Sequence, residues 1–165
     1  MSATEIFAVS DGKEPLTIGE TRNAHRGAMH VWNQISRDYF NLEGFPFFDK
    51  DNQSNVWNAD KKHQLSDSEK IVLLSTMDRA AVKNEDINKL IIAFREYGAD
   101  HPNSSYIEQA GLIDAYVKNL DEFDFVAWNQ TSVNGDLLFC DYRQDEDGEE
   151  ICAVDTSKLW SIFDE

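Results

Sequence analysis

Apolar residues along the chain recur with two periods, one typical of helices and one typical of strands. In three segments the apolar residues lie three or four positions apart, which places them on one face of an α-helix. The stripes are Ala28, Trp32, Ile35, Tyr39 and Leu42 in 25–42; Ile87, Leu90, Ile91, Phe94 and Tyr97 in 84–98; and Tyr106, Ala110, Ile113, Val117 and Leu120 in 105–120. Three amphipathic helices follow from this pattern.

Capping signals mark the helix ends. Ser66 and Glu69 form a capping-box pattern before an apolar run, so we expect a fourth helix from Ser66 to about Met77. Asn84 as N-cap and Gly98 as C-cap glycine mark the helix at 84–98, and Ser105 with Glu108 forms a second capping-box pattern at the start of the helix at 105–120. About four helices are therefore predicted.

Strand patterns occupy the two ends of the chain. Phe123–Val154 reads as three strands joined by an Asn134-Gly135 turn and an acidic turn at 145–148, and Glu5–Val9 reads as one more. Residues 79–83 fit either a short strand or a continued helix. We predict one α+β domain over 1–165, with a small antiparallel sheet (a C-terminal three-stranded meander plus the N-terminal strand) covered by the helices.

The segment 43–65 has no sustained period and is expected to be a long loop. It nevertheless contains the aromatic residues Phe45, Phe47, Phe48 and Trp57. These rings either anchor the loop on the core or form an exposed patch for a partner protein, because aromatic residues dominate interface hot spots. Phe47, Phe48 and Trp57 are therefore candidate binding residues.

The chain carries a formal net charge of −16, and most of it lies near the C-terminus. Residues 114–165 contain 14 acidic and 3 basic residues. Direct nucleic-acid binding is not expected, because neutralising phosphates requires clustered lysine and arginine. A basic protein partner fits the charge, although acidity also serves solubility.

No apolar run is long enough to cross a membrane, and the first residues lack the basic and apolar regions of an export signal. We therefore expect a cytoplasmic location. In that compartment Cys140 and Cys152 are expected to be free thiols. Cys140 is a poor candidate nucleophile, because Phe139 and Asp141 on either side disfavour a thiolate.

No metal or cofactor is expected. Aligning Gly148 with the glycine of an EF-hand loop puts Arg143 in the first position and Val154 in the twelfth, and neither is a ligand of the required kind. Glycine-rich phosphate-binding fingerprints are absent from the sequence. Asp145, Glu146 and Asp147 are accordingly kept as candidate partner-binding residues.

Trp128, Asn129 and Gln130 place polar groups at a predicted strand end, a location typical of binding sites but also of ordinary turn chemistry. Our leading hypothesis is a non-enzymatic acidic protein that binds a basic macromolecule, as an inhibitor, an immunity-type partner or a nucleic-acid mimic. The alternative is a small hydrolase or transferase with a pocket near Trp128–Ser132 and either His25 or His101 as the base. The sequence makes no prediction about oligomeric state.

Overall fold

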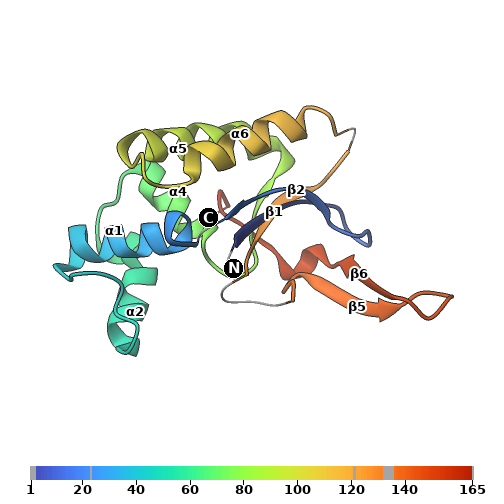
Figure 1. The fold of residues 1–165 in the computed structure, drawn as a ribbon, viewed down its shortest axis with the longest axis horizontal. Coiled ribbons are helices and arrows are strands. Elements are labelled where there is room, and N and C mark those ends of the chain that lie inside the picture. Colours follow the sequence, from blue (N-terminus) through green and yellow to red (C-terminus); the bar gives the residue numbers. More distant parts are fainter. Residues whose placement is uncertain (1–2, 23, 121, 132–135, 165) are drawn as a thin grey trace.

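A five-stranded mixed sheet forms the centre of the molecule in a computed structural model that describes residues 3–22, 24–120, 122–131 and 136–164 (Figure 1). The strands lie in the order β2-β1-β4-β3-β7. Their bounds are Ala3–Val9 for β1, Leu16–Arg22 for β2, Ala80–Lys83 for β3, Phe125–Gln130 for β4 and Trp160–Ser161 for β7. Only the pairing of β7 with β3 within this sheet is parallel.

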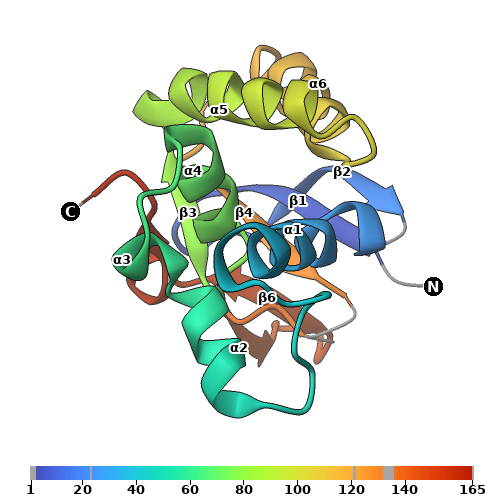
Figure 2. The same ribbon diagram turned by 90° about the vertical axis from the view of Figure 1, so that its left-hand side faces the viewer.

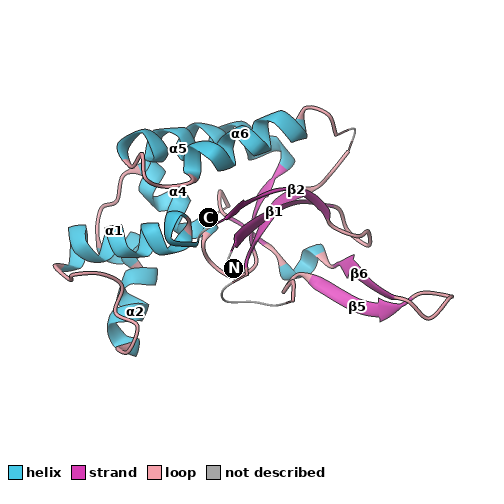
Figure 3. Ribbon diagram, viewed as in Figure 1, coloured by secondary structure: helices cyan, strands magenta, loops and turns pink. Residues whose placement is uncertain are grey.

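Six α-helices accompany the sheet in the described part of the chain, as Figure 3 shows by secondary structure. Their bounds are Ala28–Phe40 for α1, Lys50–Trp57 for α2, Ala59–Lys62 for α3, Asp67–Ser75 for α4, Ile87–Asp100 for α5 and Tyr106–Val117 for α6. Seen from the side in Figure 2, α5 and α6 run together over one edge of the molecule, with α4 beneath α5. The predicted α+β class is confirmed, and the protein is a single compact domain.

The alternation of side chains along the strands divides the core in two. On one face, Ile6 and Ala8 of β1 and Val126 and Trp128 of β4 pack with the apolar stripes of the helices. On the other face, side chains of the intervening positions form a smaller cluster, made of Phe7, Val9, Ala81 and Ala127 with Phe139, Cys140 and Val154. The helices thus cover one face of the sheet and the C-terminal segment covers part of the other.

The predicted C-terminal meander is divided between two sheets. Its first strand, β4, lies between β1 and β3 in the main sheet, whereas β5 (Cys140–Gln144) and β6 (Glu150–Val154) form a separate two-stranded sheet. The physical reason is burial: β4 has four consecutive buried residues and suits a central strand, while β5 is exposed over most of its length. The predicted Asn134-Gly135 turn lies outside the described residues.

The four predicted helices are present as α1, α4, α5 and α6, with shifted ends. The segment 25–42 contains α1, and the capping box at Ser66 and Glu69 is formed in both directions at the start of α4. Gly98, predicted as a C-cap, lies inside α5, which continues to a C-cap at His101. The second predicted capping box is wrong, because the Ser105 hydroxyl accepts a hydrogen bond from the Gln109 side chain and makes no cap at α6.

The prediction of a structureless loop at 43–65 is also wrong. Two short helices, α2 and α3, occupy much of it, and α2 begins where the Asp49 carboxylate accepts a hydrogen bond from the backbone N–H of Asn52. The sequence patterns predicted no strand at residues 16–22, which form the edge strand β2. β2 has two buried residues and α2 has one, so neither shows the strong apolar periodicity on which the prediction relied.

Searching the described residues for a helix with the length and apolarity of a membrane span yields none.

Candidate functional site

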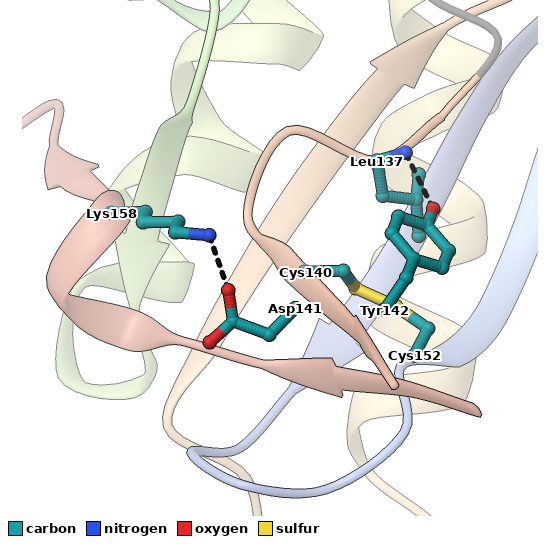
Figure 4. The surroundings of a disulfide bond; sticks show 6 residues. All are labelled: Leu137, Cys140, Asp141, Tyr142, Cys152 and Lys158. Atoms are coloured by element: carbon teal, nitrogen blue, oxygen red, sulfur yellow. Dashed lines mark hydrogen bonds and ion pairs between the residues drawn. A yellow bond between two sulfur atoms is a disulfide. The ribbon is translucent and has the colours of Figure 1, made fainter. Parts of the chain in front are cut away.

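The hairpin of β5 and β6 projects from the body of the molecule, with its turn at the far end (Figure 1). It is a regular antiparallel pair in which Cys140 lies opposite Val154, and Tyr142 lies opposite Cys152. Cys140 and Cys152 are therefore diagonal neighbours on one face of the hairpin, and the structure joins them by a disulfide with a Cα–Cα distance of 5.5 Å (Figure 4). The prediction of two free thiols is wrong.

The base of the hairpin is fixed to the domain by several independent contacts. The backbone N–H of Val154 donates to the carbonyl of Lys13 at 2.9 Å, and the N–H of Gly12 donates to the carbonyl of Val154 at 2.8 Å. Figure 4 shows two further contacts beside the disulfide. Lys158 Nζ lies 2.6 Å from an Asp141 carboxylate oxygen, and the Leu137 N–H donates to the Tyr142 hydroxyl at 2.8 Å. The hairpin is thus held at its base as well as across its strands.

The acidic turn has one structural carboxylate and several exposed ones. Asp145 Oδ1 accepts hydrogen bonds from the backbone N–H groups of Asp147 and Glu149, both at 2.9 Å. Gly148 adopts φ 81°, a conformation that glycine tolerates best. Of the three predicted binding residues here, Asp145 therefore shapes the turn, whereas Glu146 and Asp147 are exposed to solvent. No cluster of three or more potential metal ligands occurs within the described ranges.

The aromatic residues of 43–65 divide into an anchor and a surface patch. Phe45 is buried and packs against Trp32 and Trp57, with ring centroids 5.1 and 5.4 Å away. Phe47 packs against Phe45 in a tilted arrangement, with ring centroids 5.3 Å apart, and remains 59% exposed. Phe48 is fully exposed, and Trp57 is 36% exposed. The structure thus brings Phe47 and Trp57 together around Phe45, and we call Phe47, Phe48 and Trp57 the aromatic patch.

At the end of β4, two of the predicted binding residues make cross-strand hydrogen bonds. Asn129 Nδ2 donates to Glu5 Oε1 at 3.1 Å, and Gln130 Oε1 accepts from the Thr4 hydroxyl at 2.7 Å. Trp128 is buried on the helix side, 6.0 Å from the Phe94 ring. These contacts give Asn129 and Gln130 a structural role in the sheet.

A cavity of about 20 Å³ lies beside Trp128, Asn129 and Gln130 and is also lined by Leu138 and Phe139. The structure thereby brings the β4 end together with the base of the hairpin. A volume of this size holds about one water molecule. It offers no room for a substrate. Ser132, the far end of the proposed pocket, lies outside the described residues.

His101, one of the two candidate bases, lies in an aromatic cluster. Its ring packs against Tyr97 with a centroid distance of 4.4 Å, and against His30 at 5.6 Å. Burial lowers the pKa of His30, and the neighbouring His101 and Arg37 lower this pKa further. The Nε2 atom of His30 is buried and has no hydrogen-bond partner within the described part of the chain. These rings make a packed junction between α1 and the end of α5.

A buried polar network next to this junction was missed by the sequence patterns. Gln34, buried on α1, accepts a hydrogen bond from the Tyr97 hydroxyl at 3.0 Å and donates to Asp38 and Glu69. Tyr39 also donates to Glu69, and burial together with this bond raises the pKa of Tyr39 to about 12. Burial favours protonation of Glu69, but the hydrogen bonds from Tyr39, Gln34 and Ser66 outweigh it and lower the pKa of Glu69.

The aromatic patch and the acidic turn belong to different parts of the surface: α2 and the hairpin lie toward opposite ends of the long axis (Figure 1). Comparison of the chain with protein-family models, with curated proteins and with solved structures found no match. Function is therefore argued from the geometry of these sites.

Proposed function

We propose that this protein is a non-enzymatic acidic interaction protein, and that it binds a basic protein partner through the β5–β6 hairpin. The observation that carries the proposal is the combination of a projecting, disulfide-linked hairpin with exposed carboxylates at its end. Between Cys140 and Val154 the chain has six acidic residues and one basic residue. The negative electrostatic field of these carboxylates attracts a basic surface and increases the rate of association.

Preorganisation supports the same proposal. A hairpin whose strands are already cross-linked loses less conformational freedom on binding than a mobile loop of the same composition. Tyr142 and Leu138, each about two-fifths exposed on or just before β5, offer apolar contact area near the acids. Tyrosine is enriched among interface hot spots. We expect the carboxylates to steer the partner and these side chains to contribute to the buried centre of the interface.

A variant with a neutral hairpin end tests the proposal: Glu146→Gln, Asp147→Asn, Glu149→Gln and Glu150→Gln combined. The matched control replaces four exposed acids elsewhere, Glu14, Glu43, Glu85 and Glu96, by glutamine, so that both variants change net charge equally. Each protein is used as bait in a cell extract at low and high salt, and the bound proteins are identified by mass spectrometry. We expect one basic protein to bind the wild type and the control but not the hairpin variant.

Salt dependence supplies the second criterion. Exposed charges are screened within roughly 8 Å at physiological ionic strength, so capture should fall as salt increases. A partner held equally well at both salt concentrations, or lost equally from the two variants, contradicts the proposal. If captured partners are nucleic-acid-binding proteins that added DNA displaces, the hairpin acts as a nucleic-acid mimic. If DNA does not displace them, an inhibitor or immunity-type role is favoured.

The alternative of a small hydrolase or transferase has weaker support, because the cavity beside Trp128 has the size of one water molecule. A cytoplasmic location stays a prediction, and the disulfide weighs against it. Disulfides persist in oxidising compartments and are uncommon in the cytoplasm. We propose that the oxidised hairpin is the binding-competent form of the protein.

A further inference from the structure

A groove with an apolar floor lies between α4 and the C-terminal segment. Ile71 and Leu74 of α4 line one side, and Trp160, Ile162 and Phe163 line the other; the groove encloses about 680 Å³. Figure 2 shows the surrounding elements side by side, with α3 and α4 next to the end of the chain. Pockets of 300–1,000 Å³ with apolar and aromatic linings are typical of small-molecule sites.

Hydrogen bonds fix the position of the aromatic side of the groove. Trp160 Nε1 donates a hydrogen bond to the carbonyl of Asp78 at 2.9 Å, yet the side chain remains 38% exposed. The backbone of this segment is fixed as well, since β7 pairs with β3 and the N–H of Ile162 donates to the carbonyl of Ala81 at 3.0 Å. The groove therefore offers an aromatic surface on a rigid support.

The rim carries charges of both signs. It consists of Lys61, Lys70 and Lys89 with Asp60, Asp67 and Asp164. Two of these charges are engaged, because Asp164 lies 2.8 Å from Lys83 and Lys89 lies 3.2 Å from Asp86. Within the described ranges, the other four, Lys61, Lys70, Asp60 and Asp67, form neither an ion pair nor a side-chain hydrogen bond. Two ammonium and two carboxylate groups are thus free to bind a ligand.

We propose that this groove binds an apolar zwitterion, namely the α-ammonium and α-carboxylate groups of an apolar amino acid or of a short apolar peptide. The apolar side chain rests on Trp160 and Phe163, the ligand carboxylate faces Lys61 and Lys70, and the ligand ammonium faces Asp60 and Asp67. A ligand that is only anionic matches less well, because the net charge of −16 repels it and the rim aspartates would stay unpaired. This binding site is separate from the β5–β6 hairpin.

Calorimetric titration of the full chain tests the ligand class. The probes are L-phenylalanine and the dipeptide Phe-Leu, each also with an acetylated amine and with an amidated carboxylate, and glycine without an apolar side chain. We expect binding of the zwitterions, and a roughly two- to fivefold loss of affinity when either charge is blocked, the range of exposed ion pairs. Comparing L-phenylalanine with Phe-Leu distinguishes a free amino acid from a peptide. Glycine should not bind measurably.

Matched variants test the location. Lys61→Gln and Asp67→Asn should each weaken binding of the unblocked probes, while the control substitutions Lys62→Gln and Asp51→Asn, at exposed residues that do not line the groove, should leave affinity unchanged. Phe163→Ala should abolish binding, and circular dichroism checks that it folds. Absence of binding by every probe at millimolar concentration, equal binding of blocked and unblocked probes, or equal losses in the lining and control variants would overturn the proposal.

Discussion

Gly98 of α5 lies directly against Ile107 of α6. A Cβ atom on Gly98 would lie 2.5 Å from Ile107 Cγ1 and 2.9 Å from the Ile107 backbone nitrogen. Distances below 3.0 Å are not tolerated without movement, and the nitrogen belongs to a helix that cannot shift cheaply. The glycine is therefore required by the close approach of two helices, and its position in the sequence near a helix end is incidental.

Gly98→Ala should lower the free energy of unfolding by about 1–2 kcal/mol. Alanine has a helix propensity about 1 kcal/mol more favourable than that of glycine, whereas overpacking costs about 1–3 kcal/mol. Because the new Cβ would contact backbone, we expect an overpacking cost near the upper end of this range. Urea denaturation measures the change. Gly111→Ala is the matched control, because the new Cβ on α6 meets nothing within 4 Å, so this variant should be more stable by up to about 1 kcal/mol. Equal behaviour of the two variants contradicts the packing argument.

The disulfide between Cys140 and Cys152 should account for a substantial share of stability. The disulfide closes a loop with a sequence separation of 12. The resulting loss of conformational entropy in the unfolded chain stabilises the folded state by about 3 kcal/mol. We expect the double variant Cys140→Ala/Cys152→Ala to lower the free energy of unfolding by about 2–3 kcal/mol, measured by urea denaturation. Reducing the wild type should shift its denaturation midpoint in the same direction.

Thiol titration under denaturing conditions provides the control for this prediction. The protein has two cysteines, so no thiol should react before reduction and two should react afterwards. The double variant should be insensitive to reductant. Two reactive thiols in protein kept from all reductant would show that the pairing does not form.

His30 should make the protein less stable as the medium becomes mildly acidic. Burial, the adjacent His101 and Arg37 hold its pKa below the ordinary value of 6.5 in the folded state. The unfolded chain therefore binds more protons than the folded chain between these two pKa values, so the free energy of unfolding falls as pH decreases below about 6.5. Glu69, whose folded pKa lies below 4.5, loses its contribution only at lower pH.

His30→Gln isolates this contribution, since glutamine cannot be protonated. Thermal denaturation between about pH 7 and pH 5 should show a smaller loss of stability for the variant than for the wild type. The two proteins are compared by their slopes against pH, which cancels any constant effect of the substitution on packing. An unchanged slope would assign the pH dependence to other groups.

Local patterns predicted some elements well because the decisive contacts are local. The capping box at Ser66 and Glu69 forms within one turn of helix, and it is present. The same pattern at Ser105 and Glu108 fails because distant contacts compete: the Ser105 N–H donates to the carbonyl of Arg26, and Arg26 Nη1 lies 3.5 Å from a Glu108 carboxylate oxygen. A sequence pattern cannot show such long-range partners.

The same distinction between local and long-range contacts applies to the sheet and to the candidate sites. The strands β4, β5 and β6 are each readable, but the pairing of β4 with β1 and β3 depends on residues more than 40 positions away. An even number of positions separates Cys140 from Cys152, so the sequence is consistent with both lying on one face of a hairpin, but their diagonal placement depends on the register of β5 and β6. Aromatic content indicated the patch of Phe47, Phe48 and Trp57, but the groove between α4 and the C-terminal segment joins residues about 90 positions apart and leaves no local signal.

The aromatic segment offers a final test that separates anchoring from surface exposure. Phe45 is 6% exposed and packs against Trp32 and Trp57, so Phe45→Ala should lower the free energy of unfolding by about 3–5 kcal/mol. Phe48 is fully exposed, so Phe48→Ala should change stability by less than about 0.5 kcal/mol. Urea denaturation compares the two. If Phe48→Ala destabilises the protein as much as Phe45→Ala, Phe48 belongs to the core, and the aromatic patch is not a free surface.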